Sequence, residues 1–317
     1  MVYFKRISQI FFFLIGLLIL LRGLSFAFMP KNNMANFGME EVKANGILGE
    51  KENSIDVVVI GDSETYCSIS PMEIWDKTGY TSYVCGSSGQ PLNYSVKVLK
   101  RALKKQQPKI VILETNTIFR NVTLKNTVLA ELGEDFSIFD YHDNWKKINV
   151  KDSFKGATYT WTDDTKGYVF STIIAASEKK DHMKPTEECA VIADTNYHLV
   201  KKIKELCDEN GAKLLLLSTP STINWNYSRH NSVQKLSEEL ECEYIDLNLL
   251  NDMLKIDWSK DTRDKGDHLN HYGAVKVSEY VADYLKNSGL LIDHRTNKEF
   301  KHWNDSLKAY SKTIEEK

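Results

Sequence analysis

The sequence lacks the cysteine pattern of a metal-built or disulfide-built protein. Five cysteines in 317 residues form no CxxC pair and match no zinc signature. A disulfide would be possible in an exported chain, but an odd cysteine count and a large size make it dispensable. We therefore expect no structural metal and no cofactor. The cysteines are Cys67, Cys85, Cys189, Cys207 and Cys242.

An excess of charge of one sign is also missing. The chain carries 41 Lys and Arg against 43 Asp and Glu, a net charge of −2. This balance gives no reason to expect a nucleic-acid partner or strong attraction to anionic lipid. Internal repeats and low-complexity tracts are absent too, and the composition is that of an ordinary globular protein. The length suits one large domain or two small ones.

Long hydrophobic runs are confined to the N-terminus. Lys5 and Arg6 precede an apolar stretch that continues to Met29 and is interrupted late by Arg22. A span of ~20 residues is reached if Arg22 extends its charge to an interface. The preceding basic residues place the N-terminus inside and the rest of the chain outside a cell membrane. Two interpretations stay open: an uncleaved anchor over 1–29, which we favour, or a signal peptide cut after residues 25–27.

Beyond this segment, hydrophobic strands alternate with amphipathic helices. Strands are predicted at 55–60, 81–86, 109–115, 212–220 and 243–247. Helices are predicted at about 70–78, 92–106, 196–211, 233–240 and 273–289. This order predicts a three-layer α/β/α domain with a mostly parallel sheet. We expect a linker at 30–54, the domain at 55–290 with an insertion at about 117–190, and a C-terminal tail at 291–317.

The first predicted strand ends in Gly61-Asp62-Ser63. Ser63 would then stand at the carboxyl end of a strand and the amino end of a helix. Open α/β sheets bind ligands there, and helix N–H groups favour developing negative charge. Ser63 is therefore a candidate nucleophile. A helix cap formed by the same residues is the alternative.

A polar loop at 261–274 directly precedes the last predicted helix and contains several aspartates together with His268 and His271. A histidine oriented by a carboxylate and placed beside a serine meets the requirement for nucleophilic acyl transfer. Two alternatives remain for the loop itself. It could be a polar helix cap, or the histidines and aspartates could hold a metal.

Taken in order, these motifs resemble the SGNH/GDSL hydrolase superfamily over most of 55–288. The first block matches 61–63, which implies that Ser63 is the nucleophile. Residues 86–89 match the second block, so Gly89 would donate its backbone N–H to the oxyanion. His268 falls in the last block as the general base. The third block departs from the family pattern, and Asn116 is either an oxyanion donor or a structural residue.

The carboxylate that orients the histidine is displaced from the family pattern. It normally lies three residues before the histidine, and that position here is Lys265. Asp264 can reach His268 if Gly266 absorbs the extra residue. Asp267 is the immediate neighbour of His268 and would need unusual backbone geometry. We assign the role to Asp264, with Asp267 as the second choice.

Aromatic residues of the insertion and the loop at 218–231 are predicted to flank the same edge of the sheet. Trp145 and Trp225 could stack on sugar rings, and Arg229 could meet an anionic group. The alternative is that the aromatic side chains form an auxiliary core.

A membrane-tethered domain of this kind resembles the DltD-like and polysaccharide O-acetylation partners of membrane-bound O-acyltransferases. The resemblance implies an esterase or acyltransferase acting on acyl esters of a cell-envelope polysaccharide or teichoic acid. A membrane-bound O-acyltransferase is the implied protein partner. A non-catalytic binding or scaffold subunit with the same fold is the alternative.

Overall fold

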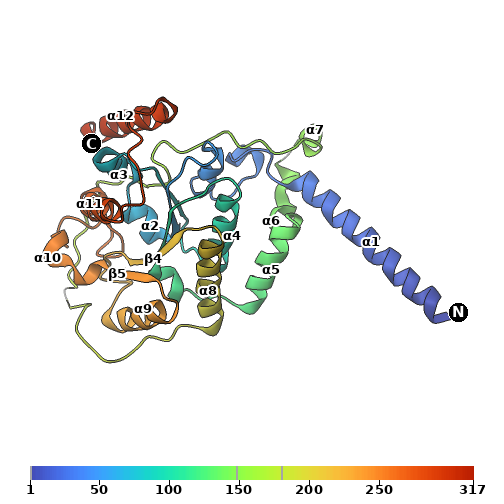
Figure 1. The fold of residues 1–317 in the computed structure, drawn as a ribbon, viewed down its shortest axis with the longest axis horizontal. Coiled ribbons are helices and arrows are strands. Elements are labelled where there is room, and N and C mark those ends of the chain that lie inside the picture. Colours follow the sequence, from blue (N-terminus) through green and yellow to red (C-terminus); the bar gives the residue numbers. More distant parts are fainter. Residues whose placement is uncertain (1, 148, 180) are drawn as a thin grey trace.

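The computed structural model describes residues 2–147, 149–179 and 181–317. A five-stranded sheet in the order β2-β1-β3-β4-β5 forms its centre, and all neighbouring strands are parallel. Helices cover both faces (Figure 1). The predicted three-layer α/β fold is therefore confirmed. The strands are β1 (Val57–Gly61), β2 (Ser82–Gly86), β3 (Ile110–Glu114), β4 (Lys213–Ser218) and β5 (Glu243–Asp246).

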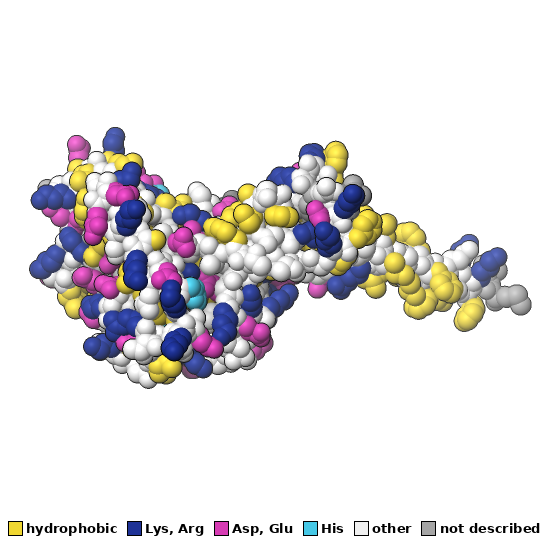
Figure 2. All heavy atoms as spheres, turned by 90° about the horizontal axis from the view of Figure 1, so that it is seen from above, with side chains coloured by type: hydrophobic (Ala, Val, Ile, Leu, Met, Phe, Trp, Pro, Cys, Tyr) yellow, Lys and Arg dark blue, Asp and Glu magenta, His cyan; other side chains and the backbone are white. Residues whose placement is uncertain are grey.

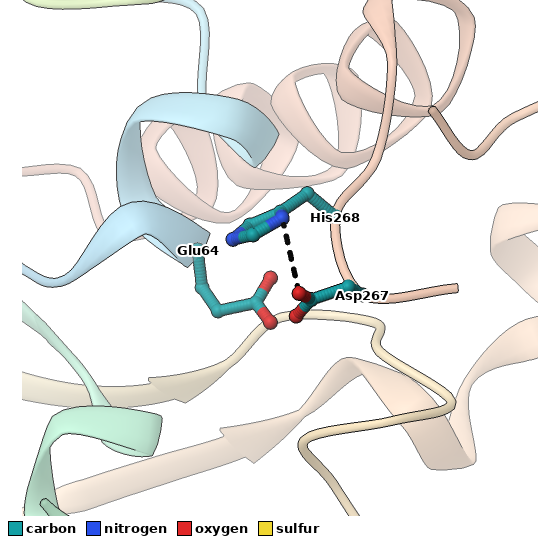
Figure 3. Close-up of side chains that lie close together, drawn as sticks. All are labelled: Glu64, Asp267 and His268. Carbon is teal, nitrogen blue, oxygen red and sulfur yellow. Dashed lines mark ion pairs between the residues drawn. The ribbon is translucent and has the colours of Figure 1, made fainter. Parts of the chain in front are cut away.

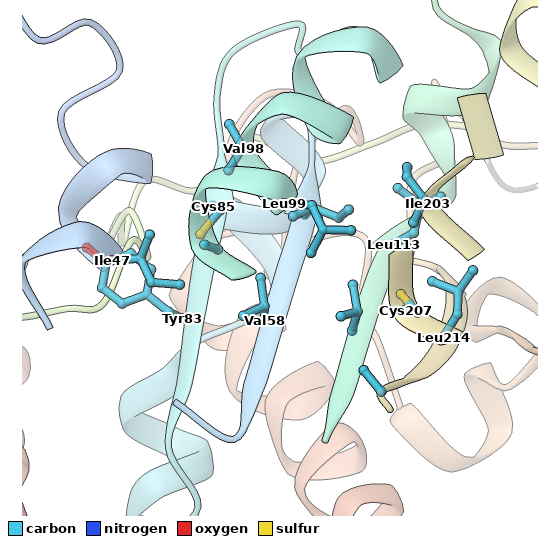
Figure 4. Packing of buried hydrophobic residues seen from close by; sticks show 14 of the residues in the cluster. Ile47, Val58, Tyr83, Cys85, Val98, Leu99, Leu113, Ile203, Cys207 and Leu214 are labelled. Atoms are coloured by element: carbon cyan, nitrogen blue, oxygen red, sulfur yellow. The ribbon is translucent and has the colours of Figure 1, made fainter. Parts of the chain in front are cut away.

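The inner strands are continuous apolar runs because both of their faces are covered. Val58 and Ile60 pack into one hydrophobic cluster together with residues of α4 (Leu92–Leu103) and α8 (Asp194–Glu209). Figure 4 shows this cluster between the sheet and these helices. Val57 and Val59 point to the opposite face and pack with residues of α11. Each fully buried aliphatic side chain contributes about 1.5–3 kcal/mol, so the sheet is the rigid part of the molecule.

Most helices that flank the sheet agree with the predicted pattern within a few residues, but α9 begins six residues earlier than predicted. Additional helices, among them α5 and α12, lie in regions where no element was predicted. The α-helices are α1 (Val2–Phe28), α2 (Ser63–Ser68), α3 (Pro71–Thr78), α4 (Leu92–Leu103), α5 (Leu124–Asp135), α6 (Ile138–Tyr141), α7 (Val150–Ser153), α8 (Asp194–Glu209), α9 (Tyr227–Glu239), α10 (Asn251–Leu254), α11 (His271–Asn287) and α12 (Lys301–Glu315). Short 3-10 helices include η2 (Ala44–Gly49), η3 (Thr115–Phe119) and η4 (His142–Lys146).

Helix α1 projects from the domain (Figure 1), and its hydrophobic side chains are exposed (Figure 2). Within the described residues, Tyr3–Phe28 is one helix with the length and composition to cross a membrane. An anchor and a signal sequence both fit this helix.

Residues 30–54 are not the linker that was predicted. Asn33 is fully buried, and its side-chain amide donates to the backbone carbonyls of Asn45 and Trp161. Ile47 in η2 is 2% exposed and packs into the sheet cluster. The segment therefore belongs to the domain. It escaped prediction because side-chain to backbone hydrogen bonds, which leave no periodicity, hold it in place.

The two other irregular regions are also structured. The insertion begins with η3 and α5–α7, and its later part runs along the edge strand β2, where the Val84 N–H donates to the Lys166 carbonyl (2.9 Å). The predicted C-terminal tail contains α12, which packs on α3. Trp303 of α12 is fully buried beside Trp75, at 5.2 Å between ring centroids. The segments at 30–54 and 291–317 therefore both contribute to the folded domain.

Candidate active site

The turn after β1 places Ser63 at the carboxyl edge of the sheet. Asp62 caps α2 by accepting the Glu64 backbone N–H (3.0 Å), so Ser63 is the first residue of the helix. Gly61 pairs with Gly86 of β2, which brings the turns after both strands side by side. A Cβ at Gly86 would lie 3.0 Å from the Asp62 carbonyl, so the close approach requires glycine there.

The histidine loop folds back on itself before α11. Thr262 and Leu269 form an antiparallel bridge across the base of the loop. Lys265 and Gly266 have φ angles of +64° and +93°, so two successive left-handed residues reverse the chain. This reversal brings the Asp264 carboxylate to the histidine. Gly266 lies at the reversal between Asp264 and His268.

Ser63, His268 and Asp264 form one chain of hydrogen bonds. His268 Nε2 lies 2.8 Å from Ser63 Oγ, and His268 Nδ1 lies 2.6 Å from Asp264 Oδ2. The other Asp264 oxygen accepts the backbone N–H of His268 (2.6 Å). Asp264 is thus bound to both the ring and the backbone of the histidine, and fixes the ring orientation.

Asp267 has different partners. Its Oδ2 is 3.7 Å from His268 Nδ1, and its Oδ1 accepts a hydrogen bond from the Asn224 side chain. The same amide nitrogen donates to Glu64 Oε1 (2.8 Å). Figure 3 shows the side chains of Glu64, Asp267 and His268 pointing toward one another. Asn224 therefore draws Asp267 toward Glu64 and leaves Nδ1 to Asp264.

These three residues also have ligand atoms within 4.8 Å of one another, close enough for a divalent cation. However, both ring nitrogens of His268 already have partners in Ser63 and Asp264. A cation on this histidine would have to displace one of them. The donor set fits proton transfer better than metal binding.

A second polar cluster lies beside Ser63 and was not anticipated. Asp62 is fully buried and accepts hydrogen bonds from Arg120 Nε (2.8 Å) and Asn116 Nδ2 (2.8 Å). Arg229 donates to Asn116 Oδ1 (2.9 Å). The amide of Asn116 is thus oriented by Asp62 and Arg229, and its role as an oxyanion donor stays a prediction. Arg120 lies 58 positions from Asp62, and no local motif marks it.

Burial and mutual repulsion shift two more carboxyl groups. Glu64 and Glu114 are each 1% exposed. Burial, reinforced by the neighbouring carboxyls Glu114 and Asp62, raises the pKa of Glu64 well above its usual range. Burial and the charge of Asp62 raise the pKa of Glu114 in the same way. Burial therefore disfavours the charged form of both groups beside Ser63.

The remaining predicted residues are placed as follows. Gly89 lies in the exposed turn after β2, and its φ of +61° suits glycine. Arg229 lies within the polar cluster of Asp62 and Asn116. Trp225 is 1% exposed and donates its indole N–H to Asp246 (2.9 Å), so it has no free face for a sugar and belongs to the core. Trp145 is exposed in η4, an element that contacts α1.

A parallel sheet that presents serine, histidine and aspartate in one hydrogen-bonded chain at its carboxyl edge has the geometry of nucleophilic acyl transfer. Solved structures that align with the chain at low identity include lipases, acylhydrolases and esterases. No protein-family profile and no curated protein sequence matches the chain.

Three of these structures illustrate the likeness. The lipase/acylhydrolase from Enterococcus faecalis aligns at 13% identity and a TM-score of 0.39, over 74% of this chain and 97% of that one. The GDSL-like lipase from Bacteroides thetaiotaomicron aligns at 13% identity and a TM-score of 0.36, over 73% of this chain and 88% of that one. The psychrotrophic esterase EstA from Pseudoalteromonas sp. aligns at 12% identity and a TM-score of 0.38, over 74% of this chain and 98% of that one.

Proposed function

We propose that the protein is a serine esterase or acyltransferase of the SGNH type. The observation that carries this proposal is the chain of contacts from Ser63 Oγ through His268 to Asp264, at 2.8 and 2.6 Å. His268 Nε2 would take the Ser63 proton as the hydroxyl oxygen attacks an ester carbonyl. Asp264 would hold the proton on Nδ1 and stabilise the imidazolium that forms.

The rest of the cycle follows from the same groups. The tetrahedral oxyanion would accept hydrogen bonds from the backbone N–H groups of Ser63 and Gly89. Losing one such donor costs about 3–4 kcal/mol of transition-state stabilisation. Collapse of this intermediate breaks the ester bond, and His268 returns the proton to the leaving alcohol. The acyl group on Ser63 then passes to water in an esterase, or to an acceptor hydroxyl in a transferase. His268 removes the proton of the attacking hydroxyl in either case.

We further propose a membrane-anchored enzyme whose domain lies outside the cell, with Lys5 and Arg6 inside. The exposed apolar surface of α1 supports the anchor. The proposed substrates are acyl esters of a cell-envelope polysaccharide or teichoic acid. This expectation comes from the motif resemblance to DltD-like proteins, which also suggests a membrane-bound O-acyltransferase as the partner.

A cleft beside the histidine loop supports a hydroxyl-rich substrate. It has a volume of about 1020 Å³ and is lined by half-buried Trp258 and by polar side chains such as Asn248 and Asn251. Ser177 also lines the cleft, and its hydroxyl forms a hydrogen bond with the Thr222 hydroxyl (2.7 Å). The Thr222 backbone N–H donates to the Gly266 carbonyl, which connects the cleft to the histidine loop. An aromatic face between amide groups suits a sugar ring. Replacing Trp258 by alanine should raise KM for a polymeric substrate about tenfold while leaving a small ester unaffected.

The experiment that tests the proposed chemistry is labelling of the full chain by a fluorophosphonate, which reacts with an activated serine. Wild type should be labelled at Ser63 and should hydrolyse p-nitrophenyl acetate. Ser63→Ala should lose both activities without unfolding. Ser311→Ala is a matched control, because Ser311 is exposed in α12 and does not line the proposed substrate cleft.

Equal behaviour of wild type and Ser63→Ala in folded protein would overturn the enzyme proposal. The binding or scaffold subunit would then be the better explanation. Release of acetate from a simple ester without any acceptor would favour the esterase over the transferase.

A further inference from the structure

The segment that connects β3 to the later part of the insertion carries an exposed hydrophobic surface. Seven large apolar side chains between residues 124 and 154 are 37–77% exposed. Soluble surfaces rarely expose apolar side chains in such a cluster without a partner. We call these seven residues the interfacial patch: Leu124, Val128, Leu129, Leu132, Phe139, Trp145 and Phe154.

The interfacial patch begins beside the end of α1 and extends away from it along α5. Helix α1 contacts α6, η4 and α7, and α5 packs on α4 and extends from α6 (Figure 1). Figure 2 shows hydrophobic side chains along α1 and again on the adjoining part of the domain. The apolar surface of α1 is therefore continued by the patch.

The junction between α1 and the patch is fixed by hydrogen bonds. Ser25 near the end of α1 accepts two hydrogen bonds from the start of α6. The Ser137 hydroxyl donates to the Ser25 carbonyl (3.0 Å), and the Ile138 N–H donates to the Ser25 hydroxyl (3.2 Å). The buried Asn144 donates to the Phe28 carbonyl (3.1 Å). Arg22 of α1 lies over the Phe136 ring, 5.0 Å from its centroid. The direction of α1 thus sets the orientation of the patch.

The chemistry of the patch matches a lipid headgroup region. Trp145 and Phe154 are 62% and 77% exposed, and residues 143–155 contain four lysines against two aspartates. Aromatic side chains flanked by lysine are typical of segments that lie in the membrane interface. The basic side chains would meet phosphate groups while the apolar ones enter the acyl boundary.

We propose that the interfacial patch lies in the outer face of the bilayer and holds the domain in one orientation beside α1. This inference rests on the membrane location of α1 in the proposed function. A protein partner and a second copy of the chain are the alternative occupants of the patch. The lipid surface is favoured because the patch continues the apolar surface of α1.

The test uses the full chain in vesicles of phosphatidylcholine and phosphatidylglycerol. Single cysteines are introduced in a Cys189→Ser background and labelled with an environment-sensitive fluorophore. The positions are Phe154→Cys and Val128→Cys in the patch, Leu18→Cys in α1, and Ile292→Cys as a control, because Ile292 is 68% exposed in the segment after α11. Spin-labelled lipid then quenches fluorophores that contact the bilayer.

We expect quenching at Leu18, Phe154 and Val128 to exceed that at Ile292 at least about threefold. The pair Trp145→Ser and Phe154→Ser should reduce quenching at Val128, because two interfacial side chains are lost. Ile292→Ser is the matched control and should leave it unchanged.

The outcomes separate this inference from the proposed function. Strong quenching at Leu18 with patch labels no more quenched than Ile292 would overturn lipid docking alone. Shielding of the patch only after a multi-span membrane protein is added would also overturn it, and would identify a protein interface. No quenching at Leu18 would overturn both the anchor and the docking, while esterase activity is measured independently.

Discussion

The two candidate carboxylates of the histidine loop should respond very differently to neutralisation. Asp264 Oδ2 lies 2.6 Å from His268 Nδ1, and Asp267 Oδ2 lies 3.7 Å from it. At an effective dielectric constant of ~20, the shorter distance makes the attraction of the imidazolium to Asp264 stronger by about 2 kcal/mol. Asp264 also makes a charged hydrogen bond worth about 2 kcal/mol. The structure therefore assigns about 4 kcal/mol more stabilisation to Asp264, or ~10³-fold in rate.

The assay is kcat/KM for p-nitrophenyl acetate with the full chain in detergent, compared among wild type, Asp264→Asn and Asp267→Asn. We expect Asp264→Asn to lose ~10³-fold because Nδ1 loses its charged partner. Asp267→Asn should lose less than about tenfold, since a 3.7 Å contact is weaker and Asn224 holds that side chain elsewhere. Thermal unfolding of all three proteins controls for folding. A larger loss in Asp267→Asn than in Asp264→Asn would refute this assignment.

Two further predictions concern buried charge. The pKa of Glu64 is raised in the folded protein. The folded protein therefore keeps a proton on Glu64 at pH values where the unfolded chain, with a carboxyl pKa near 4.3, has released it. As pH rises, this group lowers the free energy of unfolding. Glu64→Gln should therefore raise Tm at pH 8 by about 2–4 °C and make no difference near pH 4, and an unchanged or lower Tm at pH 8 would contradict this. Lys166 and Glu50 form an ion pair at 2.8 Å with both side chains 1% exposed. Lys166→Met should lower the free energy of unfolding in urea by about 3–5 kcal/mol, because the buried Glu50 loses its lysine partner and keeps only Thr162 and His302. Adding Glu50→Gln should recover much of that loss; a double variant as unstable as the single one would show that packing, not charge, is responsible.

The parts of the fold that follow hydrophobic periodicity could be predicted from the sequence. The five strands and the main flanking helices are visible as apolar runs and amphipathic segments, because burial on the sheet requires those patterns. Ser63 and His268 could be singled out because each stands at the boundary of a predicted element. Asp264 could be favoured because Gly266 permits a reversed backbone.

Other features depend on contacts between distant residues and leave no local pattern. Residues 30–54 are held by buried asparagines such as Asn33, which binds the carbonyl of Trp161 far along the chain. The pairing of Asp62 with Arg120 likewise joins separate segments. Trp225 is predicted to bind substrate because aromatic residues in a loop can stack on sugars. In the structure its indole N–H donates to the buried Asp246 carboxylate. Composition alone does not distinguish these two uses of tryptophan.

The closure of the edge strand β2 has a consequence for how the chain assembles. An open edge strand would offer its backbone groups to a second molecule, and here the Lys166 carbonyl accepts the N–H of Val84. Lys166 is held in turn by Glu50 from the start of the domain and lies under Trp303 from its end, 4.9 Å from the ring centroid. The residue that covers the edge is therefore packed against the first and last parts of the domain. Truncation before α12 should loosen this contact and favour aggregation over a smaller folded unit.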